Sequence, residues 1–517
     1  MVKSDFENEF WTVTTGDLEQ KRSPLRTPVK IEIPEVGVDK ITVDPSVRYQ
    51  KWVGVGAALT DSSAKLIWDQ TPEQRSALLH ELFSPDEGAY SVVRVPIGSC
   101  DFTSQDYYSY DDVPYGEHDH DLRHFSIGEG KPGAKNATKD LKYIVPVLQE
   151  ILTINPAVKV MASPWSGPAW MKNTGKMTMG GRLRFGEFTG NGYAHKDHFE
   201  AVYANYFIQY LNAYAKYGIP IYALTIQNEP SNAAMWPAMI WKLDEIAEFG
   251  YQYLRPALDE SYPEVKLFFW DGSLNVFDHP LTEDIRRKAA AAFDGFAFHT
   301  YDGPYTNIME IKRDYPHWEL AMTERRCLYR DTVGDASHIM FGLIGNWLVR
   351  QGLSTIILWN LALDERGLPN KAGSTGRRGV VTIDHQSGKV QRNLEYYMLR
   401  NLSQDIPVGA TLIRSSSYSP DGYTGGLTST AFQGGDGSIA VQLYNPTNKA
   451  KMAAVTIVGY DHGWQSVEVP AYGTVTCHKS NGELNESQPR PDEEFTLNPT
   501  KLNLSDDEAP GKGVNAK

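Results

Sequence analysis

The sequence contains few cysteines and no long apolar run. Its 517 residues include three cysteines, Cys100, Cys327 and Cys477. They are odd in number and widely spaced, and none belongs to a CxxC pair or a Cys/His cluster, so they indicate neither a disulfide framework nor a zinc site. No stretch approaches the roughly 18 consecutive apolar residues of a membrane span. We therefore expect a soluble protein without stable membrane association.

Positive charge is also scarce. The chain has 50 lysines and arginines against 64 aspartates and glutamates, which gives a formal net charge of -14. Nucleic acids and anionic membranes require a basic surface, so neither is expected as the main partner, and an uncharged or cationic ligand fits better. The opening residues, MVKSDFENEFWTVTTG, lack the apolar core of a signal peptide, from which we expect a cytoplasmic protein. No feature of the sequence indicates an oligomeric state.

Three histidines raise the question of a metal site. His118, His120 and His124 occur in the segment GEHDHDLRH. They lie among aspartates in a segment rich in tyrosine and glycine that has no regular period. We interpret this segment as a surface loop and predict no metal site.

Short apolar stretches of β type alternate with longer helical patterns through the middle of the chain. Such alternation is typical of repeated βα units that build a parallel sheet. The eight stretches are WVGVGAAL from Trp52, SVVRVPIG from Ser91, VKVMASPW from Val158, YALTIQNEP from Tyr222, KLFFWDGS from Lys266, FAFHTY from Phe296, ELAMTE from Glu319 and TIILWNLAL from Thr355. Eight strands close a (β/α)8 barrel, so this α/β fold, the TIM barrel, is predicted.

The predicted helices carry start and stop signals. In TPEQRSALLHELF, Thr71 is followed by Pro72 at the first helical position and by Gln74 three residues after the cap, which is the pattern of a capping box. Two longer periodic patterns end at Gly218 and Gly352, and glycine is a favoured helix stop.

The pattern changes after LEYYMLRNLSQ. Alternating strands broken by glycine, asparagine and proline follow, such as ATLIRSSSY and SIAVQLYNP, and they are typical of a β-sandwich. The stretches FWTVTTG and VKIEIPE near the N-terminus look the same and are expected to complete that sandwich. We therefore predict sandwich strands in residues 1–48, the catalytic barrel in 49–405, the rest of the all-β sandwich in 406–480 and a loose acidic tail in 481–517.

Carboxylates end two of the predicted strands. Glu229 ends the fourth strand, in TIQNEP, and Glu324 ends the seventh, in AMTERRC. A glutamate beside asparagine and proline is ordinarily a solvated turn residue. In a parallel barrel, however, the carboxyl ends of the strands gather at one mouth, so both carboxylates are expected to face the same space. Other strand ends contribute Asp61, Trp165, His299, Tyr301, Trp359 and Asn360.

Two facing carboxylates with aromatic platforms are suited to cleaving a glycosidic bond. One carboxyl must stay protonated to donate to the leaving oxygen, and the other must stay ionised to attack the anomeric carbon. Tryptophan and tyrosine offer flat apolar faces for a sugar ring. Asn228, Asp61 and Asn360 can bind its hydroxyl groups.

Several longer stretches have a familiar order and spacing. They are GVGAALTDSSAKL, RVPIGSCDF, YSYDD, HFSI, ASPWSGPAWMK, NEP, WNLALDERGLPN and GVVTIDH. On these stretches the chain, from about Trp52 to about Gly473, resembles glycoside hydrolase family 30 in its glucosylceramidase-like branch. The resemblance implies a (β/α)8 barrel with an attached β-sandwich, a retaining mechanism, and no metal or organic cofactor.

The resemblance also implies roles for individual residues. Glu229 corresponds to the general acid/base and Glu324 to the nucleophile. The remaining matches are Asn228 at the sugar 2-hydroxyl, Asp61 at the far hydroxyls, Trp165 and Trp359 as aromatic walls, Tyr301 beside the nucleophile, and Arg94 as support for the carboxylates. His299 is expected either at the substrate or as a core histidine, and Arg94 either in this support or in a purely structural ion pair.

The chain departs from the family pattern near the nucleophile. Arg325 and Arg326 follow Glu324 where small or uncharged residues are commoner, and Thr300 replaces an aromatic residue. The loop after Pro230 offers Trp236 as a possible aglycone platform. These departures place a lipid aglycone in doubt.

The predicted substrate is a β-linked glucoside or short oligosaccharide. A β-xylosidase and an endo-β-1,6-glucanase are the alternatives within the family, because the contact to a 6-hydroxyl is not evident from the sequence. An alternative of another class is a glycan-binding protein without activity, which is disfavoured because both carboxylates are present.

Overall fold

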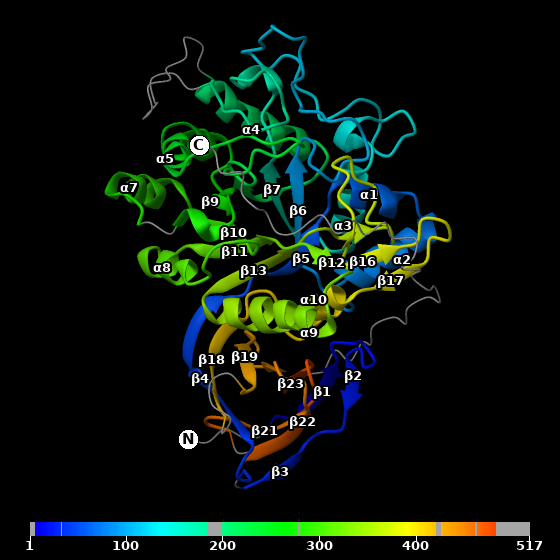
Figure 1. Ribbon diagram of the computed structural model, residues 1–517, viewed down its shortest axis with the longest axis vertical. Coiled ribbons are helices and arrows are strands. Elements are labelled where there is room, and N and C mark those ends of the chain that lie inside the picture. Colours follow the sequence, from blue (N-terminus) through cyan, green and yellow to red (C-terminus); the bar gives the residue numbers. More distant parts are fainter. Residues whose placement is uncertain are drawn as a thin grey trace.

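The chain forms a barrel and a second, all-β domain. The computed structural model describes residues 6–32, 34–184, 199–277, 280–419, 425–460 and 463–481. Figure 1 shows the barrel above the β domain, in which the N-terminal strands (blue) lie beside the C-terminal strands (orange and red). The tail predicted for residues 481–517 falls almost entirely outside the described residues.

Eight parallel strands close the barrel, as predicted. Their order around the barrel is β5 (Gly54–Ala58), β6 (Val92–Ile97), β7 (Lys159–Pro164), β8 (Ile221–Thr225), β9 (Lys266–Gly272), β10 (Gly295–His299), β11 (Glu319–Glu324) and β13 (Leu353–Leu358), with β13 pairing back to β5. Nearly every residue in these strands is buried, which is why they appear in the sequence as continuous apolar runs.

Helices cover the outside of the barrel (Figure 1). They are α1 (Asp61–Trp68), α2 (Pro72–Phe83), α3 (Ile144–Ile154), α4 (Glu200–Ala215), α5 (Leu243–Phe249), α6 (Arg255–Ser261), α7 (Glu283–Ala292), α8 (Asn307–Asp314), α9 (Val333–Ser337) and α10 (Leu394–Ser403). Two π-helical segments, Gly250–Leu254 and His338–Leu348, continue α5 and α9, and short 3-10 turns occur at Lys139–Leu141, Ala169–Met171 and Leu274–Phe277.

The helix signals in the sequence are confirmed. Thr71 caps α2 and forms a capping box with Gln74, because each side chain accepts a hydrogen bond from the backbone N–H of the other residue. Gly218 has a φ of 74° and Gly352 a φ of 110°, left-handed conformations that end a helix at little cost only for glycine.

The β domain is built from both ends of the chain, as predicted. Its strands are β1 (Asn8–Thr14), β2 (Ser23–Leu25), β3 (Val29–Ile31), β4 (Asp39–Lys51), β18 (Thr411–Tyr418), β19 (Thr428–Gln433), β20 (Ile439–Tyr444), β21 (Lys451–Ile457), β22 (Trp464–Val469) and β23 (Thr474–Ser480). β1 pairs with β23, and β4 pairs with both β18 and β21. A separate apolar core that includes Trp11, Val43, Val441 and Val455 fills this domain.

Two small sheets follow the last barrel strands in the fold. β12 (Cys327–Leu328) pairs with β15 (Arg377–Arg378), and β14 (Ala362–Leu363) pairs with β16 (Val381–Ile383), which in turn pairs with β17 (Val390–Arg392). Within the described ranges, no helix is both long and apolar enough to cross a membrane.

Candidate active site

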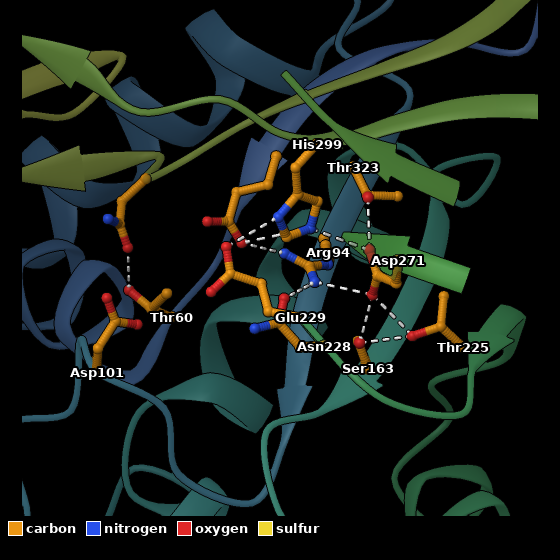
Figure 2. A network of polar contacts seen from close by, with 12 residues as sticks. Thr60, Arg94, Asp101, Ser163, Thr225, Asn228, Glu229, Asp271, His299 and Thr323 are labelled. Carbon is orange, nitrogen blue, oxygen red and sulfur yellow. Dashed lines mark hydrogen bonds and ion pairs between the residues drawn. The ribbon is translucent and has the colours of Figure 1, made fainter. Parts of the chain in front are cut away.

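The barrel interior changes from apolar to polar along its strands. A cluster of Val53, Val92, Met161, Ala223, Phe268, Ala297, Ala321 and Ile357 takes one residue from or beside each barrel strand. Side chains alternate along a strand with a period of two. The residues two positions further along five of these strands are Arg94, Ser163, Thr225, His299 and Thr323, and they form a polar network at the carboxyl ends (Figure 2). The barrel interior therefore has an apolar layer next to a polar layer at the carboxyl ends of the strands.

Asp271 lies at the centre of this network. Its carboxylate accepts hydrogen bonds from Ser163 at 2.5 Å, Thr225 at 2.7 Å and Thr323 at 2.5 Å. Arg94 and His299 contact it at 3.0 and 3.2 Å. Burial alone would raise the pKa of Asp271, but the Arg94 charge and the hydrogen bonds hold it well below its ordinary value. These contacts therefore favour the ionised form of Asp271.

The backbone of β9 explains why Asp271 points into the mouth. The register between β9 and β10 shifts after the pair of Trp270 and Ala297, and Trp270 and Asp271 have φ values of 70° and 136°. Such a bulge inserts a residue into the alternation and redirects its side chain. Asp271 was not among the residues predicted for the site.

Arg94 links the anions of the site. It is completely buried and donates hydrogen bonds to Glu324 at 2.9 Å, Asn228 at 2.7 Å and Asp271 at 3.0 Å. Its guanidinium lies 4.8 Å from the ring centroid of Trp165. Arg94 therefore combines both predicted roles, since it supports the carboxylate of Glu324 and is a buried ion pair.

Glu229 is held in an uncommon backbone conformation. Its φ is 44°, and its N–H donates to the carbonyl of Asp271 at 2.8 Å. Asn232 donates to Glu229 Oε2 at 2.8 Å, and His299 Nδ1 lies 3.3 Å from Oε1. A left-handed glutamate followed by Pro230 costs backbone energy that the surrounding bonds must offset. The result is a carboxylate that projects from the strand end into the mouth.

Glu324 faces Glu229 across a short gap. Tyr301 donates to Glu324 Oε1 at 3.0 Å, and Arg94 donates to Oε2 at 2.9 Å. Oxygen atoms of Glu229 and Glu324 and a ring nitrogen of His299 all lie within 4.8 Å of one another. Burial and the charges of the two glutamates raise the pKa of Tyr301 well above its ordinary value, so the phenol remains a donor.

His299 lies between the acids and its surroundings favour the protonated ring. Burial would lower its pKa, but the charge of Glu324 and hydrogen bonds with Asp271 and Glu229 raise the pKa to about 9. A doubly protonated ring donates from both nitrogens, which fits its two carboxylate neighbours. Desolvation raises the pKa of Glu229, but hydrogen bonding and charge from His299 outweigh this effect, so the pKa is lowered. With Arg94 and His299 already against the carboxylates, a divalent ion would meet like charge here.

Trp165 and Trp359, which were predicted as separate aromatic walls, lie together on one side of the site. Trp165 and Trp359 stack on each other with ring centroids 5.2 Å apart, and each is 2% exposed. Phe102 packs edge-on against Trp359, and the partly buried Trp236 packs against the same cluster. Three residues far apart in the sequence thus form a continuous apolar surface beside Arg94 with Trp236 at its edge.

Two aspartates near the mouth differ in what they contact. Asp61, the first residue of α1, accepts hydrogen bonds from Ser104 at 2.7 and 2.5 Å and from Gln105 at 2.6 Å. Asp101 was not among the predicted residues. Its Oδ1 is buried without a hydrogen-bond partner in the described part of the chain, and its Oδ2 lies 3.5 Å from Arg377.

The charges of Glu324 and Glu229 affect the protonation of Asp101. Burial raises its pKa, Arg377 opposes this rise, and the charges of Glu324 and Glu229 add to it, so that the pKa is about 7. Figure 2 shows Asp101 beside Thr60, at the side of the mouth opposite Asp271. Asp101 thus faces the site, while Asp61 holds the loop that follows Asp101.

The remaining predicted residues take the following places. Asn228 receives a hydrogen bond from Arg94, and Asn360 Oδ1 receives one from Thr60 at 2.7 Å, while Asn360 Nδ2 is buried without a partner among the described residues. The guanidinium groups of Arg325 and Arg326 lie 5.8 and 5.3 Å from the ring centroid of Tyr301. Both arginines therefore border the mouth.

Comparison with known proteins agrees with the geometry. Residues 52–373 match the family model of the glycosyl hydrolase family 30 TIM-barrel domain, and residues 409–477 match that of the family 30 beta sandwich domain. An endo-1,6-beta-D-glucanase of Trichoderma harzianum is 30% identical over 77% of this chain and 78% of its own length. The lysosomal acid glucosylceramidase of Mus musculus is 27% identical over 84% and 82%.

A solved structure shows the same architecture. The structure of an endo-beta1,6-glucanase, 26% identical, superimposes with a TM-score of 0.76 over 92% of this chain and 100% of its own. The family models cover both domains, and the first of them alone covers more than half of the chain. The chain therefore belongs to glycosyl hydrolase family 30, and it is a glycoside hydrolase that acts on a carbohydrate substrate.

Proposed function

We propose that the protein is a retaining β-glycosidase that hydrolyses β-glucosidic bonds by double displacement. The observation that carries this proposal is the approach of Glu229 and Glu324 oxygens to within 4.8 Å. Retaining glycosidases hold their carboxyl groups about 5 Å apart, whereas inverting enzymes separate them by about 6.5–9.5 Å to admit a water molecule. The gap leaves room for a direct attack on the sugar and none for an intervening water.

Glu324 acts as the nucleophile. It attacks the anomeric carbon while the bond to the leaving oxygen breaks and Glu229 gives that oxygen its proton. Arg94 and Tyr301 each donate a hydrogen bond to one oxygen of Glu324, so the carboxylate is held in one orientation. In the second step Glu229 takes a proton from water, the water oxygen attacks the anomeric carbon, and the ester bond to Glu324 breaks.

Glu229 must gain a proton before the first step. His299 lowers the pKa of Glu229 in the open site, so the carboxyl is protonated mainly at acidic pH. A bound sugar displaces water from the mouth, which disfavours the ionised form. We therefore expect activity to be greatest on the acidic side of neutrality.

The sugar-binding end is marked by unpaired polar atoms. Asp101 Oδ1 and Asn360 Nδ2 are both buried without partners among the described residues, and a buried polar atom is stable only when it is hydrogen-bonded. A sugar hydroxyl can satisfy both, since it is donor and acceptor at once. The stacked Trp165 and Trp359 offer the adjoining apolar wall. The hydroxyl groups of β-glucose can supply both partners, and the comparison with a β-xyloside tests whether its 6-hydroxyl contributes.

A second candidate is endo-β-1,6-glucanase activity. The similarity to the Trichoderma enzyme and to the solved endo-beta1,6-glucanase supports it. The glucosylceramidase similarity supports a glucoside with a different leaving group, but Arg325 and Arg326 border the mouth and make a lipid leaving group less suitable. β-Glucoside hydrolysis is common to both candidates.

A substrate panel separates the candidates. The panel compares an aryl β-glucoside, an aryl β-xyloside, a linear β-1,6-glucan and glucosylceramide in detergent. We expect the aryl glucoside to exceed the xyloside in kcat/KM, and rapid loss of glucan chain length would identify the endo activity. Equal or greater turnover of the xyloside would overturn the assignment of glucose.

Trapping tests the role of Glu324. A 2-fluoro-β-glucosyl fluoride slows both steps through its electronegative 2-substituent, while its good leaving group keeps the first step the faster, so the glycosyl-enzyme accumulates. Peptide mass spectrometry should place one fluoroglucosyl group on Glu324. A label on another residue would contradict the proposed nucleophile.

A further inference from the structure

A second group of metal-ligating side chains lies outside the active site. Asp111, Asp119 and His124 belong to the long segment between β6 and α3, and one ligand atom of each lies within 4.8 Å of the others. Donors that share one ion at about 2.1 Å lie about 3–4 Å apart, so small side-chain movements close this arrangement. None of the three takes part in the proposed reaction.

Asp111 is a buried carboxylate with an unused oxygen. It is completely buried, and its Oδ1 has no hydrogen-bond partner within the described residues. The other oxygen, Oδ2, accepts a hydrogen bond from Trp170 Nε1 at 3.1 Å. An ionised oxygen buried without a partner is costly, and a cation is the partner that best offsets this cost.

Asp119 and His124 leave the cluster short of positive charge. Asp119 Oδ2 accepts hydrogen bonds from both the backbone N–H and Nδ1 of His124, each at 2.8 Å. One imidazole is thus set against two carboxylates. The two carboxylates repel each other without a further cation.

We propose that Asp111, Asp119 and His124 form a binding site for one divalent transition-metal ion. Two carboxylates and one imidazole suit zinc or manganese, whereas calcium and magnesium prefer oxygen ligands alone. The side chain of His124 is 67% exposed, so an ion can enter from solvent. Trp170 already orients the Asp111 carboxylate from outside, as outer hydrogen bonds do around metal ligands.

The proposed site would connect two parts of the barrel rim. Asp111 and His124 belong to the segment that follows β6 and also contains Asp101, whereas Trp170 lies in the short turn after β7. An ion bound here would cross-link residues within the segment that follows β6, and the hydrogen bond between Trp170 and Asp111 would connect it to the turn after β7. Its expected effect is on stability and not on the chemical step. His118, His120 and His124 are all exposed in an irregular segment, as the surface-loop interpretation predicts, and the proposal departs only from the prediction of no metal site.

The test is calorimetric titration of the chelator-treated full-length protein with zinc and, separately, with manganese chloride. We expect about one equivalent of saturable binding. Asp111→Asn, which can still accept the Trp170 hydrogen bond, and His124→Gln, at an exposed position, should each weaken binding at least about tenfold. The control is Glu365→Gln, in the separate group of Asp364, Glu365 and His385, which should bind as wild type does.

Three outcomes would overturn the proposal. They are the absence of saturable binding by the wild type, equal affinity in Asp111→Asn and His124→Gln, and loss of binding in Glu365→Gln. Circular dichroism of each metal-free variant shows whether it is folded, and His124→Gln keeps the test decisive if Asp111→Asn does not fold. The proposed glycosidase activity is not part of the readout, so the two proposals fail independently.

Discussion

Among the individual residues of the site, His299 influences the protonation of Glu229. It contacts both Glu229 and Asp271, and its charge keeps the pKa of Glu229 below the ordinary value. In the proposed mechanism Glu229 must be protonated to donate, so its pKa determines where activity falls as pH rises. The charge of Glu324 and the hydrogen bonds to Asp271 and Glu229 in turn raise the pKa of His299.

His299→Gln should therefore shift the pH profile. Removing the cation lets the pKa of Glu229 rise, so the alkaline limb of kcat/KM for an aryl β-glucoside should move to higher pH, together with a loss of kcat. The pH dependence of kcat/KM in both proteins measures the shift. An alkaline limb that stays in place or moves to lower pH would contradict the assigned coupling.

Asp101 and Asp61 provide a second comparison. Asp101→Asn replaces one carboxyl oxygen that faces the mouth by an amide nitrogen and should lower kcat/KM for glucosides about 100-fold, since a site built to bind a hydroxyl depends on that partner. Asp61→Asn weakens the hold on Ser104 and Gln105 and should mainly lower thermal stability. Kinetics and melting curves distinguish the two effects. A larger kinetic loss for Asp61→Asn at unchanged stability would return the hydroxyl-binding role to Asp61.

Elements differ in how far the sequence predicts them. The eight barrel strands were predictable because strands buried on both faces leave continuous apolar runs, and Glu229 and Glu324 followed from their position at strand ends. Asp271 was not predictable from alternation, because a period of two from Phe268 puts it outside the barrel and the bulge in β9 turns it inward.

Loop residues were harder still. Asp101 lies in the segment after β6, where no periodicity fixes the path of the chain, whereas Asp61 directly follows β5 and was assigned to the mouth. The position of Asp101 in RVPIGSCDF, an acid soon after a strand end, was a signal that could have identified it as a candidate for the mouth. The stacking of Trp165 on Trp359 also depends on tertiary packing that spacing does not reveal.

Lys172 connects the loops that surround the mouth. Its ammonium group is fully buried and donates to Ser166 at 3.0 Å, Met177 at 2.9 Å and Ala238 at 2.6 Å. These contacts join the loop after β7 to the loop that follows Glu229 and contains Trp236. Burial lowers the pKa of Lys172 to about 7, so its charge depends on these acceptors rather than on an acid.

Lys172→Met should loosen this connection. Three acceptors lose their donor, at a cost of about 2–4 kcal/mol in stability. KM for substrates with a bulky leaving group should rise more than KM for a small aryl glucoside, while kcat changes less. The exposed Lys176→Met on the same segment is the matched control. Equal KM changes for both substrate types would refute a positioning role for Lys172.

A buried ion pair between Arg22 and Asp405 joins the two domains of the molecule. Arg22, between β1 and β2, contacts Asp405 through two nitrogens at 3.0 Å and donates to Asn401 at 2.8 Å. The Arg22 side chain is 1% exposed and that of Asp405 is 5% exposed.

Arg22→Met should destabilise the protein without changing its chemistry. Removing one partner leaves Asp405 buried and unpaired, which costs about 3–5 kcal/mol. Denaturant unfolding should show the loss, and kcat of the folded protein should stay within about twofold. The exposed Arg26→Met nearby should leave stability unchanged. Unchanged stability in Arg22→Met would show that the pair does not hold the domains together.

The stereochemistry of hydrolysis shows directly whether the site is retaining or inverting. Proton NMR of an aryl β-glucoside digest follows the first sugar anomer released, with Glu324→Ala and Glu229→Ala as comparisons. The approach of the two carboxylates predicts that β-glucose appears first and that each variant loses most turnover. Initial release of α-glucose would contradict the direct attack by Glu324.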